Sequence, residues 1–368
     1  MKLFRRSQCL WLNFLALALS SLGCLAIFNA SVQFEDPWYF LSRQLLWILA
    51  GSAVMVTLSF LRSELLKKSV YFLYIFFLFL MIFVLFRGDE VNGMRGWISL
   101  GAFQIQPSEL IKPFFCLAFS VFWQEQNKEK LVNEVNLYFK ALAFLIFPLC
   151  LITFQPDFGT FVVFLLAFTA FYLSVGGRAR FVLYSAVAIV PFFIIVLVAK
   201  PYVLDRLLAF ASPESFAESS GYHLMQLKRT FANGGFLGQP FGQGIWGQAY
   251  LPLTHNDSIF ASFTEVTGFV GAVTIIVFFA GLLFLTLRWY SAQEGQDYRH
   301  YTVLFCVFFL VIQAYLHISV NLLVFPPTGI TLPFFSYGGS SLSSCFVMVG
   351  FMGSMLSSII LSKNRKAL

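Results

Sequence analysis

Two oppositely charged residues, Glu109 and Lys112, stand three positions apart in an otherwise apolar stretch. Residues three apart on a helix share a face, so these side chains can form an ion pair. Charges inside a membrane are costly and are candidates for function by default. Two interpretations follow: a structural ion pair that holds a helix bundle together, or part of a polar substrate site. Pro113 predicts a kink beside Lys112.

A second group of polar residues surrounds Asp257 in the segment 251–258. His255 precedes it by two positions, and Glu265 follows two helical turns later. A carboxylate at the edge of a low-dielectric region has a raised pKa and is suited to act as a general base. The same residue could also cap the helix that begins after it.

Asp157 occupies the equivalent place before another apolar segment, and we expect it to be an N-cap. The stretch 242–247 matches G-x-G-x-x-G, but no strand precedes it, so loop flexibility is the better explanation of its glycines. Metal-ligand spacings, a Walker motif, H-E-x-x-H and G-x-S-x-G do not occur. The sequence therefore does not support an ATPase, a zinc protease or an α/β-hydrolase.

The elements that must position these residues are membrane helices. The chain is 59% hydrophobic and 11% charged, whereas soluble proteins are about 45–50% apolar and about 25% charged. Segments of about 20 apolar residues are long enough to span a bilayer. We expect an all-α, polytopic membrane protein that forms a single domain over residues 1–368, with about ten transmembrane helices near 10–30, 40–61, 69–87, 107–124, 137–155, 158–176, 181–199, 258–288, 301–324 and 341–361.

Charge counting predicts how this bundle is oriented. Of the 24 Lys and Arg residues, sixteen fall on one set of connections and six on the other, with Arg43 and Lys112 inside spans. The positive-inside rule then places both termini in the cytoplasm, and this topology, not nucleic-acid binding, explains the net charge of +7. A long outer loop, residues 200–257, connects the seventh and eighth helices, and we expect Tyr222–Phe231 to form an amphipathic helix at the membrane interface.

Five segments together resemble the SEDS family (shape, elongation, division and sporulation), which includes the RodA and FtsW proteins. The matching residues lie at 92–98, 106–112, 155–160, 251–261 and 333–341, in the family's order. Alone, the segment 333–341 is explained by helix packing, since small residues allow close approach of backbones.

The resemblance implies a ten-helix peptidoglycan glycosyltransferase, which polymerises lipid II on the outer face of the bacterial cytoplasmic (inner) membrane. The family's essential aspartate falls on Asp257. It also implies a partner, a class B penicillin-binding protein that supplies the transpeptidase. The chain departs from the family at Leu253 and Val266, where acids are usual, and it lacks the lysine that FtsW-like proteins often have in 326–329. That absence and a short amino-terminal tail favour a RodA-like role in elongation over a division-type FtsW.

In the mechanism that the resemblance implies, Asp257 takes the proton from the attacking sugar hydroxyl. Alternatively, a divalent cation (Mg²⁺ or Mn²⁺), bound by Asp257 or Glu265, neutralises the leaving diphosphate; no other cofactor is expected. The remaining candidate substrate-binding residues are Glu109, Lys112, Arg95, Asp157, His255, Lys228, Arg229 and Glu265. A lipid II flippase and a membrane scaffold that recruits other wall-synthesis proteins are the competing functions.

Overall fold

The computed structural model describes residues 2–91, 93–101, 103–127, 133–199, 201–218, 220–293 and 295–366. For residues 2–10, 192–199, 201–203, 220 and 362–366 it describes the backbone alone. Lys200, the predicted start of the outer loop, lies outside the described residues.

A helix occurs at each of the ten predicted spans. Within the described ranges, seven helices are long and apolar enough to cross a membrane. These are α1 (Lys2–Ser31), α2 (Trp38–Phe60), α3 (Ser63–Arg87), α5 (Glu134–Phe154), α10 (Ile259–Ser291), α11 (Tyr298–Asn321) and α12 (Gly339–Lys366). The other three spans correspond to α4 (Pro107–Gln126), which carries Glu109 and Lys112, and to α6 (Phe158–Ser174) and α7 (Ala179–Ala199). The chain is thus a polytopic, mainly helical membrane protein.

The centre of the bundle is α11, which packs against α4, α6, α10 and α12. Its contacts with α4 and α6 consist largely of phenylalanine rings, with Phe305 stacked on Phe171 and edge-on to Phe115 and Phe119. All four rings are buried. Edge-to-face and offset ring pairs of this kind fill a core without requiring polar partners. The rings therefore fill the core between α11, α4 and α6.

A small antiparallel sheet is the one addition to the predicted all-α fold among the described residues. Strands β1 (Asp89–Val91), β2 (Met94–Leu100) and β3 (Phe103–Ile105) connect α3 to α4. Val91 pairs with Met94, and the sequence between them, Asn92-Gly93, is a strong hairpin signal. The sheet ends immediately before α4, the helix that carries Glu109 in its first turn.

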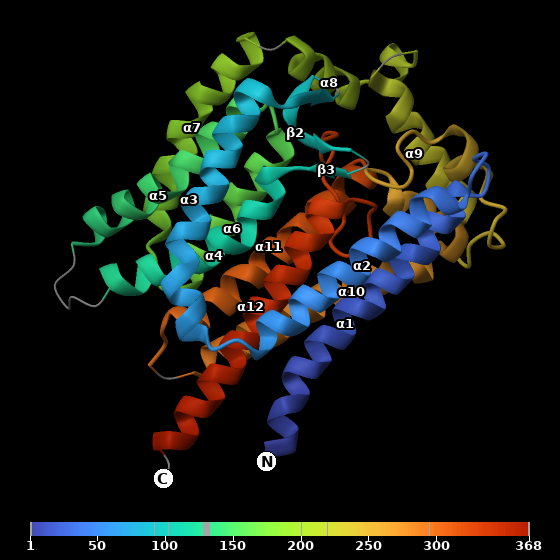
Figure 1. Ribbon diagram of the computed structural model, residues 1–368. Helices are drawn as coiled ribbons and strands as arrows, with labels where there is room; N and C mark the ends of the chain where they lie inside the picture. The colour runs from blue at the N-terminus through green and yellow to red at the C-terminus, as the bar shows by residue number, and fades with distance from the viewer. Residues whose placement is uncertain are drawn as a thin grey trace.

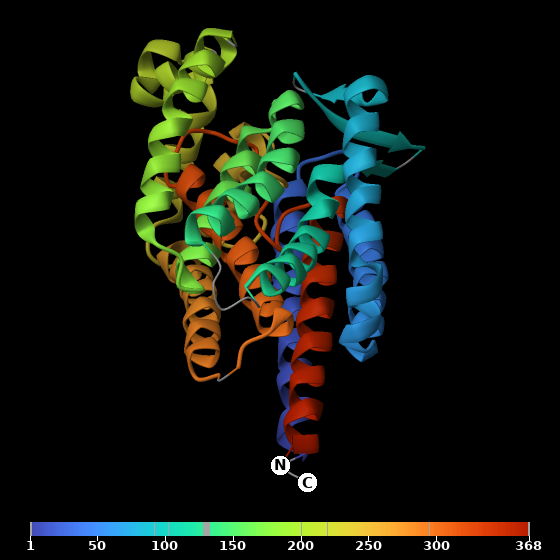
Figure 2. The ribbon, with the colours of Figure 1, turned by 90° about the vertical axis from the view of Figure 1, so that its left-hand side faces the viewer.

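Both termini lie at the same end of the molecule, and β2, β3, α8 and α9 lie at the opposite end, called the far end below (Figures 1 and 2). The predicted outer loop is at this far end and is largely helical. It contains α8 (Pro201–Ala211), a 3₁₀ turn η1 (Pro213–Phe216), α9 (Ser220–Gly234) and a π turn η2 (Trp246–Tyr250).

The predicted amphipathic helix is present as α9, but its apolar face does not face lipid. Leu224 and Leu227 are buried, and Leu227 packs with Leu251 and Ala261. The prediction placed this face on the membrane, and the structure places it on protein because α9 packs along the start of α10.

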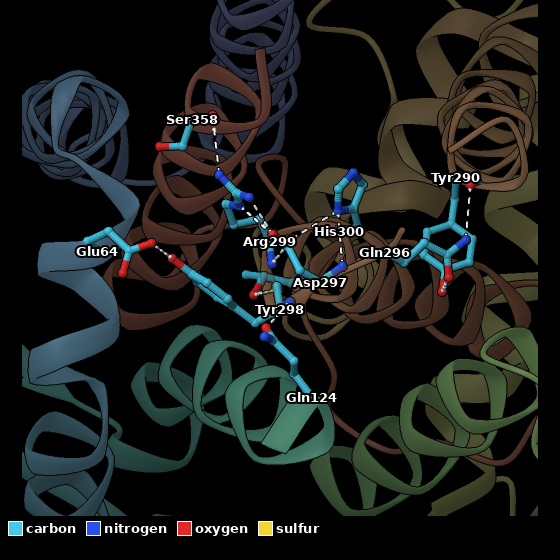
Figure 3. A network of polar contacts seen from close by, with 10 residues as sticks. Glu64, Gln124, Tyr290, Gln296, Asp297, Tyr298, Arg299, His300 and Ser358 are labelled. Carbon is cyan, nitrogen blue, oxygen red and sulfur yellow. Dashed lines mark hydrogen bonds and ion pairs between the residues drawn. The ribbon is translucent and has the colours of Figure 1, made fainter. Parts of the chain in front are cut away.

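A polar cluster at the start of α11 ties four helices together at the end that carries the termini (Figure 3). Asp297 caps α11 and accepts from Arg299 Nε (2.7 Å). Tyr298 donates its hydroxyl to Glu64 of α3 (3.1 Å) and its backbone N–H to Gln124 of α4 (2.7 Å), and Arg299 donates to a carbonyl of α12. The cluster therefore fixes α11 relative to α3, α4 and α12.

We expect Asp297→Ala to lower the free energy of unfolding in detergent by about 2 kcal/mol, because a cap and a charged hydrogen bond are both lost. Burial raises the pKa of Asp297, but hydrogen bonds from His300 and Arg299 and their charges outweigh it, so the pKa lies below its usual range. The ionised form thus stabilises the fold at neutral pH and loses this effect as pH falls below about 4. Asp297→Asn, which keeps the cap, is expected to show a deficit that shrinks in acid. A deficit independent of pH would contradict this explanation.

Candidate active site

Asp257 lies in a turn between η2 and α10, and the connection from α11 to α12 holds the backbone of that turn. The carbonyls of residues 255–257 accept, in order, from the Tyr337 backbone N–H, the Ser336 hydroxyl and the Asn321 side-chain amide, each at 2.9 Å. Three consecutive anchors fix the turn firmly. The position of Asp257 is therefore set by main-chain contacts and leaves its carboxylate free.

Asp257 is not the N-cap of α10. The cap position is Ser258, which makes no capping hydrogen bond with its side chain. Instead, Asn321 at the end of α11 caps α10, because its Oδ1 accepts from the Ala261 N–H (3.1 Å) in the first turn of α10. Among the described residues, none donates a hydrogen bond to the Asp257 carboxylate. The alternative capping interpretation of Asp257 does not hold.

Burial raises the pKa of the half-buried Asp257 carboxyl to about 6, and the charge of Arg206 on α8 opposes this rise. Gly329 lies close to this carboxyl, since an added Cβ would be 3.6 Å from Oδ2. A carboxylate with a pKa near the working pH is ionised for most of the time and is still basic enough to accept a proton.

The two neighbouring histidines are neutral. Burial lowers the pKa of His255 to about 4, and its ring stacks on Phe40 with the centroids 4.0 Å apart. Burial and the charge of Arg206 lower the pKa of His223 to about 4, and its Nε2 lies 2.7 Å from the Ser258 hydroxyl. Both rings therefore support the Asp257 turn by packing and hydrogen bonding, without adding positive charge.

The predicted pair of Glu109 and Lys112 forms a buried ion pair in the first turns of α4. Lys112 is fully buried, and its Nζ donates to Glu109 Oε1 and to Gln313 Oε1 of α11 (2.8 Å). Glu109 Oε2 is buried, and no described residue donates a hydrogen bond to it. The pair thus serves as a link between α4 and α11.

Asp157 is the predicted N-cap of α6. Its Oδ1 accepts from the Thr160 N–H (3.0 Å). Its Oδ2 also accepts from the side chains of Gln106 (3.2 Å) and Ser108 (3.4 Å) at the start of α4. Asp157 and Glu109 consequently belong to one polar cluster, at the far end of α4 and α6.

The connection from α11 to α12 joins this cluster to Asp257. Gln313 donates from Nε2 to the Thr331 carbonyl (3.1 Å), and the hydroxyls of Thr331 and Ser341 are 2.6 Å apart. Five residues after Thr331 in the same connection, Ser336 donates to the Asp257 turn. Residues 333–341, explained from sequence by helix packing, thus also position the candidate base.

Glu265 anchors the loop that leads to Asp257. It is fully buried and accepts from Asn233 Nδ2 (2.7 Å), the Trp246 N–H (3.0 Å) and the Gly247 N–H (2.6 Å). A Cβ on Gly247 would lie 2.7 Å from Glu265 Oε2. Close approach to this carboxylate, rather than loop flexibility, explains the glycine at position 247.

We expect Gly247→Ala to lower the free energy of unfolding by about 1–3 kcal/mol, the usual effect of overpacking a tight contact. The measurement is thermal unfolding in detergent. Gly281→Ala is the matched control, since a Cβ at Gly281 in α10 meets nothing within 4 Å. Equal behaviour of the two variants would show that Glu265 does not require the glycine.

Three predicted cations lie away from the Asp257 turn. Arg95 is exposed on β2 and pairs with Glu90 (3.3 Å). Lys228 and Arg229 are exposed and follow His223 by five and six positions, so they project from a different face of α9. The guanidinium of Arg229 lies over the Trp246 ring, 5.3 Å from its centroid. The cation whose charge acts on Asp257 is Arg206, which the sequence did not single out.

Sequence reasoning also missed Gln313 and Asn321. Together with His317 they recur every four positions along apolar α11, so they share one face. All three are buried, and each hydrogen-bonds to a segment that positions a predicted site residue. Polar residues at helical spacing in a membrane span could have identified them.

Comparison with known proteins finds relatives along nearly the whole chain. The FtsW/RodA/SpoVE family model, described as "Cell cycle protein", matches residues 8–359. A "Probable peptidoglycan glycosyltransferase FtsW" of Saccharophagus degradans is 34% identical over 337 residues, covering 88% of this chain and 86% of that protein. The "Stage V sporulation protein E" of Bacillus subtilis is 30% identical over 357 residues, covering 95% and 96%.

Solved structures with the same fold include a chain from work on "polymerization and crosslinking by a peptidoglycan synthase complex". It has a TM-score of 0.77 and 28% identity, and the match covers 94% of this chain and 96% of that one. The "Rod shape determining protein RodA" of Thermus thermophilus has a TM-score of 0.68 and 26% identity, with 94% and 95% covered.

Proposed function

The chain belongs to the FtsW/RodA/SpoVE family of cell cycle proteins, and on this basis we propose that it is a peptidoglycan glycosyltransferase that polymerises lipid II. The observation that supports the proposal most directly is the state of Asp257. Its carboxylate caps no helix, and the backbone of its turn is held by hydrogen bonds to the carbonyls of residues 255–257. The far end of the bundle is the outer face of the bacterial cytoplasmic membrane, where lipid-linked sugars are joined.

In the proposed reaction, a sugar hydroxyl attacks the anomeric carbon of a second, diphosphate-linked sugar. The new C–O bond forms as the bond to the diphosphate breaks, and Asp257 accepts the hydroxyl proton. Charge-assisted hydrogen bonds stabilise the leaving diphosphate. Arg206, whose charge acts on Asp257, is the first candidate for this role, and Arg95, Lys228 and Arg229 are further exposed cations at the far end. Lys112, whose ammonium is used by Glu109 and Gln313, holds the connection that positions Asp257.

An assay in closed vesicles separates this function from a lipid II transporter. Purified protein is reconstituted with labelled lipid II, and both glycan chains and movement of the label between leaflets are followed. We expect polymer without translocation. Translocation without polymer would overturn the proposal in favour of the flippase.

The rate of polymerisation is expected to rise as pH increases through about 6. Below this value Asp257, whose pKa burial raises to about 6, is protonated and cannot accept the hydroxyl proton. The rate should therefore fall about tenfold for each further pH unit, because only the ionised fraction is active. The measurement is the initial rate between pH 5 and 8 at lipid II concentrations well below KM, because kcat/KM reports the pKa of the substrate-free protein. A flat profile would show that Asp257 does not titrate in the rate-limiting step.

A divalent cation, Mg²⁺ or Mn²⁺, fits the proposal only if Asp257 and the diphosphate of the substrate bind it together. Over the described part of the chain, no three His, Cys, Asp or Glu side chains gather as a metal site, and Glu265 already accepts three hydrogen bonds. The Asp257 carboxylate would hold the cation, with phosphate oxygens and water as the other ligands, as is usual for Mg²⁺. Bound there, the cation would neutralise diphosphate charge.

We further propose that the chain works with a class B penicillin-binding protein and serves cell elongation. A structural neighbour comes from a peptidoglycan synthase complex, which supports a transpeptidase partner. The missing lysine in 326–329 supports a RodA-like role, although the curated relatives cited above include an FtsW. Expression in cells depleted of RodA or of FtsW tests the role. Restored rod shape without restored division is expected, and the reverse would assign the chain to division.

A further inference from the structure

Helix α10 is longer than a bilayer requires. As one straight helix its 33 residues would measure about 50 Å, whereas a hydrocarbon core is about 30 Å thick. The helix is broken at Gly268, which has φ +66°. Residues 259–265 before the break are all buried by protein, whereas Phe269 and Val270 directly after it are exposed and apolar. The part that crosses the membrane therefore begins at the break, and Phe269–Arg288 supplies the necessary length.

At this break, the backbone of the loop after α9 forms hydrogen bonds with the backbone of α10. The N–H groups of Phe269 and Val270 donate to the carbonyls of Gly235 (3.0 Å) and Phe236 (3.4 Å). A Cβ on Gly268 would lie 2.4 Å from the backbone nitrogen of Gly238, so this approach requires glycine. The contact satisfies backbone groups that lipid cannot, and it places residues 235–239 at the depth where the hydrocarbon core begins.

The side chains of Phe236 and Leu237 in this loop point away from the protein. Phe236 and Leu237 are 67% and 78% exposed, and Phe236 stacks on the exposed ring of Phe269 (5.9 Å between centroids). Burial of such side chains in an apolar phase is favourable. Their apolar surface continues the exposed apolar face of α10.

A second contact indicates the depth of the same loop relative to the membrane. Phe241 stacks on Phe28 near the end of α1 (6.4 Å), and Phe28 contacts Trp38 at the start of α2 (5.0 Å). Trp38 is exposed, and aromatic residues of this kind gather at the membrane–water interface. Two independent packing contacts thus place the loop at the outer boundary of the bilayer.

We propose that residues 235–241 of this loop are inserted into the outer leaflet, with Phe236 and Leu237 among the acyl chains of membrane phospholipids. The lipid-binding element of the outer loop is this segment and not α9, whose apolar face is covered by protein. Because Glu265 hydrogen-bonds both Trp246 and Gly247, the inserted loop is tied to the start of α10. Insertion therefore holds the Asp257 turn at a fixed height, up to about 14 Å beyond the hydrocarbon boundary at 1.5 Å per helical residue. The contact with lipid does not depend on which reaction Asp257 performs.

Spin-label accessibility tests the insertion. Leu237→Cys is labelled with a nitroxide in a Cys9→Ser, Cys150→Ser background and reconstituted into phosphatidylethanolamine–phosphatidylglycerol vesicles. Relaxation by oxygen, which concentrates in acyl chains, is compared with relaxation by a water-soluble nickel chelate. Gln243→Cys, an exposed polar position of the same loop, is the matched control, and Phe236→Cys is a second test site should Leu237→Cys fold poorly.

We expect the ratio of oxygen to nickel accessibility to be several-fold higher at positions 237 and 236 than at 243. A label at 237 as accessible to nickel as the label at 243 would place the loop in water. A label at 237 that neither reagent reaches would show that protein covers the position. Either result would overturn the proposal.

Discussion

Asp257→Asn is expected to abolish glycan polymerisation while leaving the protein folded and able to bind lipid II. Asparagine matches aspartate in size but cannot take up the hydroxyl proton, and loss of a general base lowers rates by about 10²–10⁴-fold. The fold should tolerate the change, because the turn is held through carbonyls of residues 255–257 and the Asp257 side chain caps no helix. Polymer yield, lipid II binding and thermal unfolding are measured on the same preparation.

Asp205→Asn provides the matched control for this variant. Asp205 is an exposed aspartate on α8, next to Arg206 and at the same end of the bundle. The control should polymerise lipid II like the unaltered protein. Poor folding of Asp257→Asn, with a normal control, would instead restore the interpretation of Asp257 as a structural residue.

Lys112→Met should produce the largest loss of stability. The change removes one partner of a buried ion pair and leaves the Glu109 carboxylate in an apolar setting, where its Oε2 has no hydrogen-bond partner within the described part of the chain. Breaking such a pair costs about 3–5 kcal/mol. The measurement is the free energy of unfolding in detergent.

The double variant Lys112→Met, Glu109→Gln separates the two interpretations of the pair. Removing both charges should recover most of the stability, as replacement of a buried pair often does. Polymerisation should stay low, because Gln313 has lost the ammonium that orients it toward Thr331. Recovery of both stability and polymerisation would show that Glu109 and Lys112 form only a structural ion pair and have no role in polymerisation.

The helices were predictable because lipid imposes a simple rule. A bilayer requires about 20 apolar residues per helix. A helix occurs at each hydrophobic run that was predicted to span the membrane, and among the described residues seven of these helices are long and apolar enough to cross it. Local spacing also predicted the contact of Glu109 with Lys112 and the capping of α6 by Asp157. Both interactions join residues three positions apart, so the residue types at that spacing are enough to predict them.

The supports of Asp257 were not predictable, because they join residues far apart in the chain. Asn321 lies 64 positions from the carbonyl it holds, and Ser336 lies 80 positions from its acceptor. The same distance explains why the apolar face of α9 was assigned to lipid: the start of α10 that covers it follows a further loop. The sheet between α3 and α4 is different, since Asn92-Gly93 signalled a hairpin that was overlooked.

The most direct test of the account compares two proteins in detergent, where no second compartment exists. The unaltered chain and Asp257→Asn are each incubated with lipid II and without a partner, and products are resolved by glycan length. We predict glycan chains from the unaltered protein and only unreacted, bound lipid II from the variant. Glycan chains of equal yield from both proteins would contradict the assignment of Asp257 as the base.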